Sequence, residues 1–140
     1  MPELNRKAKG DLAEMRVAAD LLSRGYKVAF PFGEDWDYDL ILCRRENLER
    51  VQVKYTRSDG RVIVIRCRSQ SLTNGRVRAT KQYTSATVDW IAAYDATTDR
   101  CYYVPAAVLG VGMHMLSLRL SPSRNGQRER IRAAADHVDI

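Results

Sequence analysis

The sequence is poor in cysteine and histidine, and this scarcity excludes several kinds of site. The three cysteines, Cys43, Cys67 and Cys101, are far apart and form no CxxC pair. They therefore predict neither a zinc knuckle nor a disulfide framework, and a reducing, cytoplasmic location fits best. The two histidines, His114 and His137, form no HxxxH or His-Asn-His pattern, which argues against histidine-based catalysis.

Long hydrophobic runs are also absent. No apolar run approaches the ~20 residues of a membrane span, and residues 1–10 lack the apolar stretch of a signal peptide. Hydrophobic residues make up 45% and charged residues 29% of the 140 residues, which is an ordinary globular composition. We expect one domain over residues 1–140 and no membrane partner.

Negative charge is scarce in one part of the chain. The net charge is +6, but residues 44–82 contain 11 basic and 3 acidic residues, against 6 and 8 in residues 1–43. A locally basic segment indicates a polyanionic partner, with nucleic acid the first candidate. The alternative is a solvated basic face.

Hydrophobic periodicity predicts a helix over residues 11–24, in which Asp11 caps the start and Gly25 ends the helix. Its apolar positions at helical spacing are Leu12, Met15, Ala19 and Leu22.

Alternating and β-branched segments predict strands over residues 26–30, 37–42, 50–55, 61–68, 88–94, 101–104 and 115–120. Between them we expect a polar turn at 44–49, a hairpin signal at Asp59-Gly60, and a long loop or irregular arm at 69–81. One helical turn at 105–109, a loop at 122–127 and a short helix at 128–137 complete the chain. This order predicts an α+β domain around a mixed or antiparallel sheet.

Four polar residues stand out by position: Glu14, Asp39, Gln52 and Lys54. Adjacent strands can bring Asp39 next to Gln52 and Lys54, and the helix can cover them with Glu14. Phosphodiester hydrolysis is served by a hard divalent ion held by carboxylate and carbonyl oxygens. Asp39 is then the anchor ligand, the Gln52 amide and the Val53 backbone carbonyl are further ligands, and Glu14 binds directly or through water. Lys54 would stabilise charge on the phosphate or hold the attacking water.

Each of these residues has an alternative role. Glu14 lies three residues after Asp11, a spacing typical of a capping box. Asp37 competes with Asp39 for the functional position. Gln52 and Lys54 lie on the opposite strand face from Val51 and Val53, and that face is also compatible with plain solvent exposure.

The segments DYDLI at 37–41 and RVQVK at 50–54 resemble the core motif of the PD-(D/E)XK nuclease superfamily, with Gln52 at the usual acidic position. The glutamine is similar to that of the branch containing group I intron-encoded homing endonucleases of cyanobacterial type. Further similarity runs through residues 88–95, 101–105 and 118–127, so the resemblance covers roughly residues 10–135.

This resemblance implies a restriction-endonuclease-like core, a mixed central β-sheet flanked by helices. It also implies a Mg²⁺-dependent (or Mn²⁺-dependent) endonuclease that cleaves a specific double-stranded DNA site as a homodimer or homotetramer. It places the metal ligand on Asp39, the catalytic lysine on Lys54 and the helix glutamate on Glu14. Gln52 in place of a carboxylate removes one negative charge and should weaken metal binding.

The basic segment predicts a DNA-binding β-ribbon or loop arm over about residues 57–82. Its phosphate or base contacts would come from Arg57, Arg61, Arg66, Arg68, Arg76, Arg78 and Lys81, and Gln70, Asn74 and Gln82 are candidate readers of adenine. Alternation puts Arg66 and Arg68 on one face and Arg61 on the other. A second contact is predicted in the C-terminal loop and helix at about 121–137, through Arg124, Asn125 and Gln127.

Two further functions compete with site-specific cleavage. The chain could be a structure-specific nuclease resembling Holliday junction resolvases, or a DNA-binding protein with a decayed active site. An RNA-binding role is disfavoured because no RNP-like aromatic motif is present.

Overall fold

A five-stranded mixed β-sheet forms the centre of the computed structural model, which describes residues 2–73, 76–122 and 132–140. The strand order is β1 (Lys27–Ala29), β2 (Leu40–Arg44), β3 (Asn47–Thr56), β7 (Trp90–Asp95) and β8 (Arg100–Pro105). Neighbours are antiparallel except β3 and β7, which are parallel. The predicted α+β class with a mixed sheet is confirmed.

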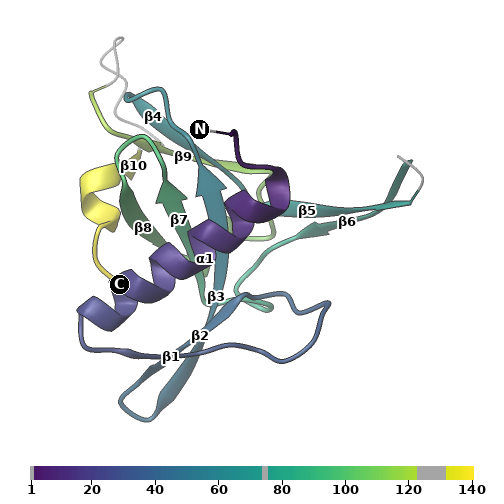
Figure 1. Cartoon of the computed structure of the whole chain (residues 1–140), viewed down its shortest axis with the longest axis horizontal. Coiled ribbons are helices and arrows are strands. Elements are labelled where there is room, and N and C mark those ends of the chain that lie inside the picture. The colour runs from purple at the N-terminus through teal and green to yellow at the C-terminus, as the bar shows by residue number, and fades with distance from the viewer. Residues whose placement is uncertain (1, 74–75, 123–131) are drawn as a thin grey trace.

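The two faces of this sheet are covered differently (Figure 1). Helix α1 (Arg6–Ser23) packs on one face through a core that includes Val17, Leu21 and Val51. A second sheet, in the order β10 (Arg132–Ala133), β9 (Met115–Arg119) and β4 (Val62–Arg66), covers the other. Besides α1, the helical elements of the described residues are the 3-10 turns Ala106–Leu109 and Ala134–His137.

Helix α1 begins five residues earlier than predicted. Asn5 is its N-cap, and the Asn5 side chain accepts a hydrogen bond of 2.8 Å from the Ala8 N–H. Asp11 is therefore inside the helix and caps nothing, so a capping box of Asp11 and Glu14 is excluded. The predicted stop is confirmed, since Gly25 follows the helix with a φ of +86°.

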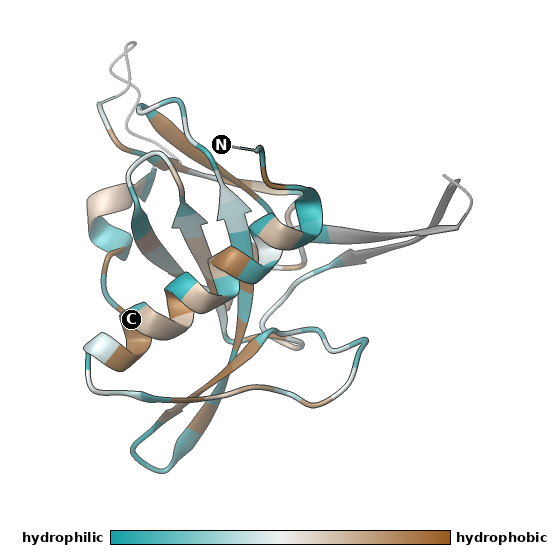
Figure 2. Cartoon of the chain, viewed as in Figure 1, coloured by the Kyte–Doolittle hydropathy of each residue, from teal (hydrophilic) through white to brown (hydrophobic). Residues whose placement is uncertain are grey.

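The buried face of α1 differs from the predicted one. Ala13, Val17, Ala18 and Leu21 are buried, whereas Met15 and Leu22 are about half exposed. Small residues let the helix lie close to the sheet, so Ala13 and Ala18 occupy positions that a search for large apolar residues passes over. Figure 2 shows the apolar residues of α1 and of the strands. The rotation of the buried face leaves Glu14 at the boundary between helix and sheet.

The connections between strands also depart from prediction. The expected turn at 44–49 is shorter, because β2 and β3 pair up to Arg44 and Asn47 and only Arg45 and Glu46 turn. The turn at Asp59-Gly60 forms, with the Asp59 carboxylate accepting from the Arg61 and Val62 N–H groups. It does not join a hairpin, however, since β4 pairs with β9 in the second sheet.

The predicted arm is a two-stranded antiparallel hairpin of β5 (Arg68–Thr73) and β6 (Arg76–Gln82), which projects from the body of the molecule (Figure 1). The C-terminal helix predicted at 128–137 is wrong over the part that the structure describes, where Arg132–Ala133 pair with β9 and a 3-10 turn follows. Parallel pairing with β9 offers backbone partners that the alanine-rich sequence does not reveal. The described chain contains no helix long and apolar enough to cross a membrane.

Asp95 connects the ends of the parallel strands. Its fully buried carboxylate accepts hydrogen bonds from the Ser58 N–H and hydroxyl at 2.7 and 2.9 Å and from the Thr98 N–H and hydroxyl at 3.1 and 2.8 Å. Burial by itself would raise the pKa of Asp95, but these hydrogen bonds from Ser58 and Thr98 outweigh it and lower the pKa. Asp95 thereby fixes the segment that leaves β3 for the second sheet.

We predict that Asp95→Asn lowers the free energy of unfolding at neutral pH by about 2 kcal/mol, since an amide nitrogen replaces a charged acceptor of several hydrogen bonds. Because the folded pKa is lowered, this contribution is present at neutral pH and is lost as the pH falls through that pKa. Urea denaturation at several pH values measures both effects. Asp11→Asn, at an exposed carboxylate, is the matched control and should stay close to wild type; equal effects of the two substitutions would contradict the role given to Asp95.

Candidate active site

Asp39 is fixed to the middle strand of the sheet by two hydrogen bonds. It lies directly before β2, and its N–H donates to the Val51 carbonyl at 2.9 Å. Its carboxylate Oδ2 accepts from the Val53 N–H, also at 2.9 Å. The carboxylate thus takes the place of the next backbone partner of β3, just beyond the pair of Leu40 and Val51 with which the β2–β3 ladder ends.

The Val53 carbonyl points toward the same place. The ladder between β2 and β3 ends at the pair Leu40 and Val51, and β3 continues to Thr56. In a strand, the N–H and C=O of one residue point to the same side. The Val53 N–H donates to Asp39, so the Val53 carbonyl points to the same side. It therefore points into the gap beside β3 that lies beyond the pair of Leu40 and Val51.

Gln52 and Lys54 flank Val53 on the face away from Val51 and Val53, as the alternation predicted. Val51 and Val53 pack with α1, so Gln52 and Lys54 lie on the face opposite the helix that was expected to cover them. Gln52 is 7% exposed, so the alternative of a solvent-facing strand does not hold for it. Its amide nitrogen donates to the Val53 carbonyl at 3.3 Å. Lys54 is partly buried, and its Nζ lies 5.0 Å from the centroid of the Tyr83 ring.

Glu14 reaches the same gap from α1. Burial, followed by the charge of Asp39, raises the pKa of Glu14 to about 7. Burial likewise raises the pKa of Asp39, against the opposing effects of the Val53 N–H and Lys54. Burial lowers the pKa of Lys54, and the charge of Asp39 opposes this. The charge of Asp39 acts on both Glu14 and Lys54, so the three groups form one electrostatic unit.

The donor set of this unit fits a hard divalent cation. Two carboxyl groups lie together, and their pKa values are raised although the positive charge of Lys54 acts on Asp39. A backbone carbonyl points to the same gap. A 180° turn of the Gln52 amide exchanges its nitrogen and oxygen, so its oxygen can take the place beside the Val53 carbonyl. Oxygen ligands of this kind suit Mg²⁺ and Mn²⁺. Within the described residues no group of three His, Cys, Asp or Glu side chains forms a metal cluster.

The competing residue Asp37 differs from Asp39 in the groups it acts on. It contributes to the electrostatic environment of Arg50, whereas Asp39 is the residue in contact with Glu14 and Val53. The structure therefore brings together Glu14, Asp39, Gln52, Val53 and Lys54, the same five residues that the sequence grouped.

The predicted DNA-contacting residues fall into three groups. Arg57, Arg61, Arg66, Arg68 and Gln82 are exposed. Arg66 and Arg68 alternate with buried Ile65 and Cys67, as predicted. The backbones of Gln70, Arg76, Arg78 and Lys81 lie in the β5–β6 arm, and Asn74, Arg124, Asn125 and Gln127 lie outside the described residues.

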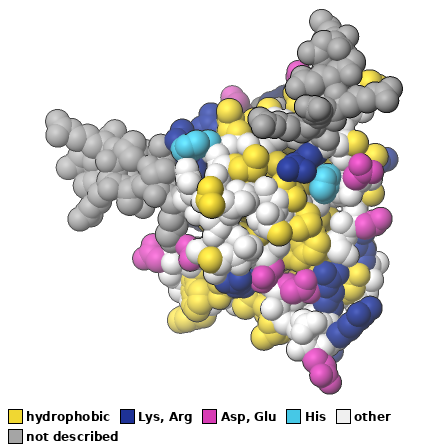
Figure 3. Space-filling view, turned by 180° about the vertical axis from the view of Figure 1, so that it is seen from behind, with side chains coloured by type: hydrophobic (Ala, Val, Ile, Leu, Met, Phe, Trp, Pro, Cys, Tyr) yellow, Lys and Arg dark blue, Asp and Glu magenta, His cyan; other side chains and the backbone are white. Residues whose placement is uncertain are grey.

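The base of the arm is a polar cluster rather than a row of free side chains. The Arg68 guanidinium and the Gln82 amide both contact the His114 ring, at 3.3 and 3.2 Å. Figure 3 shows a histidine beside basic side chains next to the arm, on the face away from α1. Gln82, predicted to read adenine, is thus occupied with His114 in this structure.

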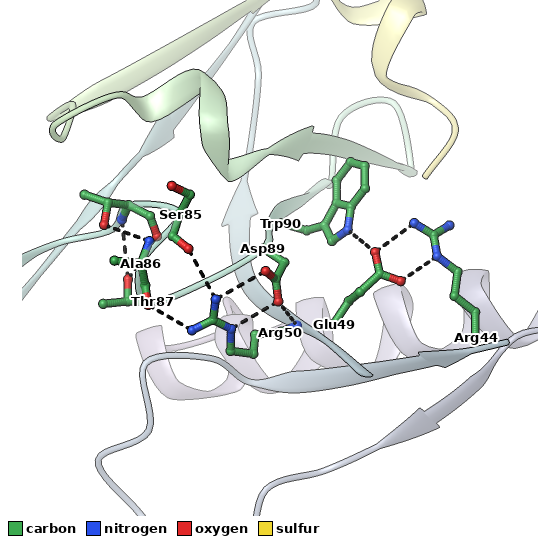
Figure 4. A network of polar contacts seen from close by, with 9 residues as sticks. Arg44, Glu49, Arg50, Ser85, Ala86, Thr87, Asp89 and Trp90 are labelled. Carbon is green, nitrogen blue, oxygen red and sulfur yellow. Dashed lines mark hydrogen bonds and ion pairs between the residues drawn. The ribbon is translucent and has the colours of Figure 1, made fainter. Parts of the chain in front are cut away.

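Sequence reasoning misses two features of the structure around β3. Tyr83 was not singled out, although its ring is the surface over which Lys54 lies. An ion-pair network was missed as well: Arg50 binds Asp89, and Arg44 binds Glu49, which also accepts from the Trp90 indole (Figure 4). The acidic Asp89 within the predicted apolar strand 88–94 is the available signal for it.

Comparison with known proteins agrees with this arrangement. The family model described as PD-(D/E)XK endonuclease matches residues 4–140. No curated protein sequence matches the chain. Among solved structures, the chain is similar to a bacterial homing endonuclease, I-Ssp6803I, with a TM-score of 0.75 and 22% identity, covering 91% of this chain and 86% of that one.

At that identity the structural match establishes a shared fold. The family match extends over nearly the whole chain and includes every residue of the gap beside β3. The chain belongs to the PD-(D/E)XK endonuclease family and is a nuclease.

Proposed function

We propose that the protein is a divalent-metal-dependent endonuclease that cleaves double-stranded DNA at a specific site. The observation that carries the proposal is the convergence of Glu14, Asp39 and the Val53 carbonyl in one gap beside Lys54. The fold shared with a bacterial homing endonuclease supports site-specific cleavage, and the projecting arm with exposed Arg66 and Arg68 at its base supports DNA as substrate.

In this proposal Asp39, the Gln52 amide oxygen and the Val53 carbonyl hold Mg²⁺ or Mn²⁺, with Glu14 bound directly or through water. When bound, the ion supplies Lewis-acid stabilisation of the phosphate and lowers the pKa of a water molecule. Asp39 is oriented for this role by the Val53 N–H, so little side-chain entropy is lost on binding. The Glu14 carboxylate, once it has released its proton, supplies the second negative charge.

Lys54 provides the positive charge that does not come from the metal. Its ammonium is partly buried on the sheet face next to Gln52, where a charge interacts more strongly than in water. There it can donate a hydrogen bond to a phosphate oxygen whose charge increases during the reaction, or to the attacking water.

Cleavage of both strands of a duplex is most simply done with two such sites, and the described residues of one copy form one. We therefore include a homodimer or homotetramer in the proposal, with symmetric arms on symmetric half-sites. The proposal also includes a cytoplasmic location.

The direct test is cleavage of a randomised duplex library and of supercoiled plasmid, with and without Mg²⁺. We expect cleavage with Mg²⁺ at a recurrent site, a loss of about 10²–10³-fold in rate for Lys54→Ala, and no detectable cleavage for Asp39→Asn. Binding to DNA without Mg²⁺ should remain close to wild type for Lys54→Ala. Equal cleavage by wild type and Lys54→Ala would exclude the role of Lys54, and preference for four-way junctions over any linear duplex would favour a structure-specific nuclease.

A second prediction concerns pH. Because the pKa of Glu14 is raised to about 7 in the metal-free protein, metal binding must displace its proton at lower pH. Mg²⁺ affinity, measured by isothermal titration calorimetry, should rise by up to about tenfold per pH unit from pH 6 to 7 and level off above that. Proton release should accompany binding at pH 6, and Glu14→Gln should abolish both. A pH-independent affinity in wild type would show that Glu14 does not join the metal site.

A third prediction concerns Gln52, an uncharged residue at the position where the PD-(D/E)XK motif usually has a carboxylate. Gln52→Glu should lower the Mg²⁺ concentration for half-maximal cleavage by about tenfold, since an added carboxylate strengthens a hard-cation site. Without metal the same variant should be less stable than wild type, because a third carboxylate joins Glu14 and Asp39. Thermal denaturation with EDTA and with Mg²⁺ measures this reversal, and Gln52→Leu is the control that should raise the required Mg²⁺ concentration. If neither substitution changes the Mg²⁺ dependence, Gln52 is not a ligand.

A further inference from the structure

Tyr83 is the aromatic residue in contact with the ammonium of Lys54. The Nζ atom lies 5.0 Å from the centroid of the Tyr83 ring, within the range at which the negative face of an aromatic ring attracts a cation. Tyr83 is 5% exposed and belongs to the core between the two sheets. Burial strengthens the attraction, because the ring and the ammonium are partly shielded from water.

The position of Tyr83 is set at the root of the β5–β6 arm. Tyr83 directly follows β6, and its N–H donates to the Cys67 carbonyl at 3.2 Å. Cys67 is fully buried and directly precedes β5, and its own N–H donates to the His114 carbonyl at 2.9 Å. The two ends of the arm are thus joined to each other and to the body at the level of Lys54.

The chain after Tyr83 is fixed as well (Figure 4). The Arg50 guanidinium donates to the Ser85 and Ala86 carbonyls at 3.3 and 3.0 Å and pairs with Asp89 at 3.1 Å. Arg50 and Lys54 belong to the same strand, β3. Tyr83 is therefore held from both sides to the framework that carries Lys54, by Cys67 before the arm and by Arg50 after the turn.

The geometry points to Tyr83 as a positioning residue for Lys54: its ring holds the ammonium beside the Asp39 carboxylate and connects it to the root of the arm. The inference rests on the proposed function for the role of Lys54 and adds the group that orients it. Tyr83 touches neither metal nor substrate in this account and acts through the lysine. The ring face makes the contact with the ammonium.

The test is a series at position 83 consisting of Tyr83→Phe, Tyr83→Leu, and phenylalanines carrying one to three ring fluorines, which weaken the negative ring face in steps at nearly constant size. The single-turnover cleavage rate should stay within about twofold of wild type for Tyr83→Phe, fall progressively with fluorination, and drop about five- to tenfold for Tyr83→Leu. DNA affinity without Mg²⁺ should be unchanged across the series. Melting temperatures show whether any loss follows stability instead of ring electrostatics.

A second readout needs no activity. In proton NMR spectra the ε-methylene signals of Lys54, assigned by comparison with Lys54→Ala, should be shifted upfield by the ring in wild type and Tyr83→Phe and should lose that shift in Tyr83→Leu. A flat rate series together with an inactive Lys54→Ala would overturn the role of Tyr83 and leave the proposed function standing. An active Lys54→Ala would instead remove the proposed role of the lysine, and the inference with it, even if the NMR shift is present.

Discussion

The hydrogen bond from the Val53 N–H to the Asp39 carboxylate, 2.9 Å long, is the contact on which the site depends. It replaces a backbone partner of β3 with a charged side chain just beyond the pair of Leu40 and Val51, where the β2–β3 ladder stops. Because the N–H of Val53 is used in this way, its carbonyl points to the same gap, and Gln52 and Lys54 are placed on either side of it. Helix α1 then adds Glu14, whose pKa is raised by burial and by the charge of Asp39.

The surrounding fold supports this site on both faces of the sheet. Helix α1 packs closely on one face through Ala13 and Ala18, and β4 and β9 cover the other with Ile63, Ile65 and Leu118. The parallel pairing of β3 and β7 fixes the strand that carries Gln52 and Lys54 in the middle of the sheet. Polar groups are thus concentrated at one place between two apolar layers, where burial raises the pKa of Glu14 to about 7.

The sequence predicted the mixed sheet and the grouping of the site, because both follow from local patterns. Alternation along β3 separates Val51 and Val53 from Gln52 and Lys54, and this periodicity does not depend on distant residues. Prediction from the sequence failed where contacts with distant residues decide the structure. The buried face of α1 follows the sheet it meets, the segment after Asp59-Gly60 pairs with β9 instead of β3, and residues 132–133 pair with β9 instead of extending a helix. Tyr83 could not be linked to Lys54, since 29 positions separate them and their contact depends on where the arm returns to the body.

The central claim is that the gap between Asp39 and the Val53 carbonyl holds a divalent cation next to Lys54. Anomalous diffraction from a crystal equilibrated with Mn²⁺ at pH 8 tests it most directly. The account predicts an anomalous peak within bonding distance of an Asp39 carboxylate oxygen and the Val53 carbonyl oxygen, with the Gln52 amide oxygen turned toward it. A peak bound elsewhere, or no peak in this gap at saturating Mn²⁺, would contradict the account.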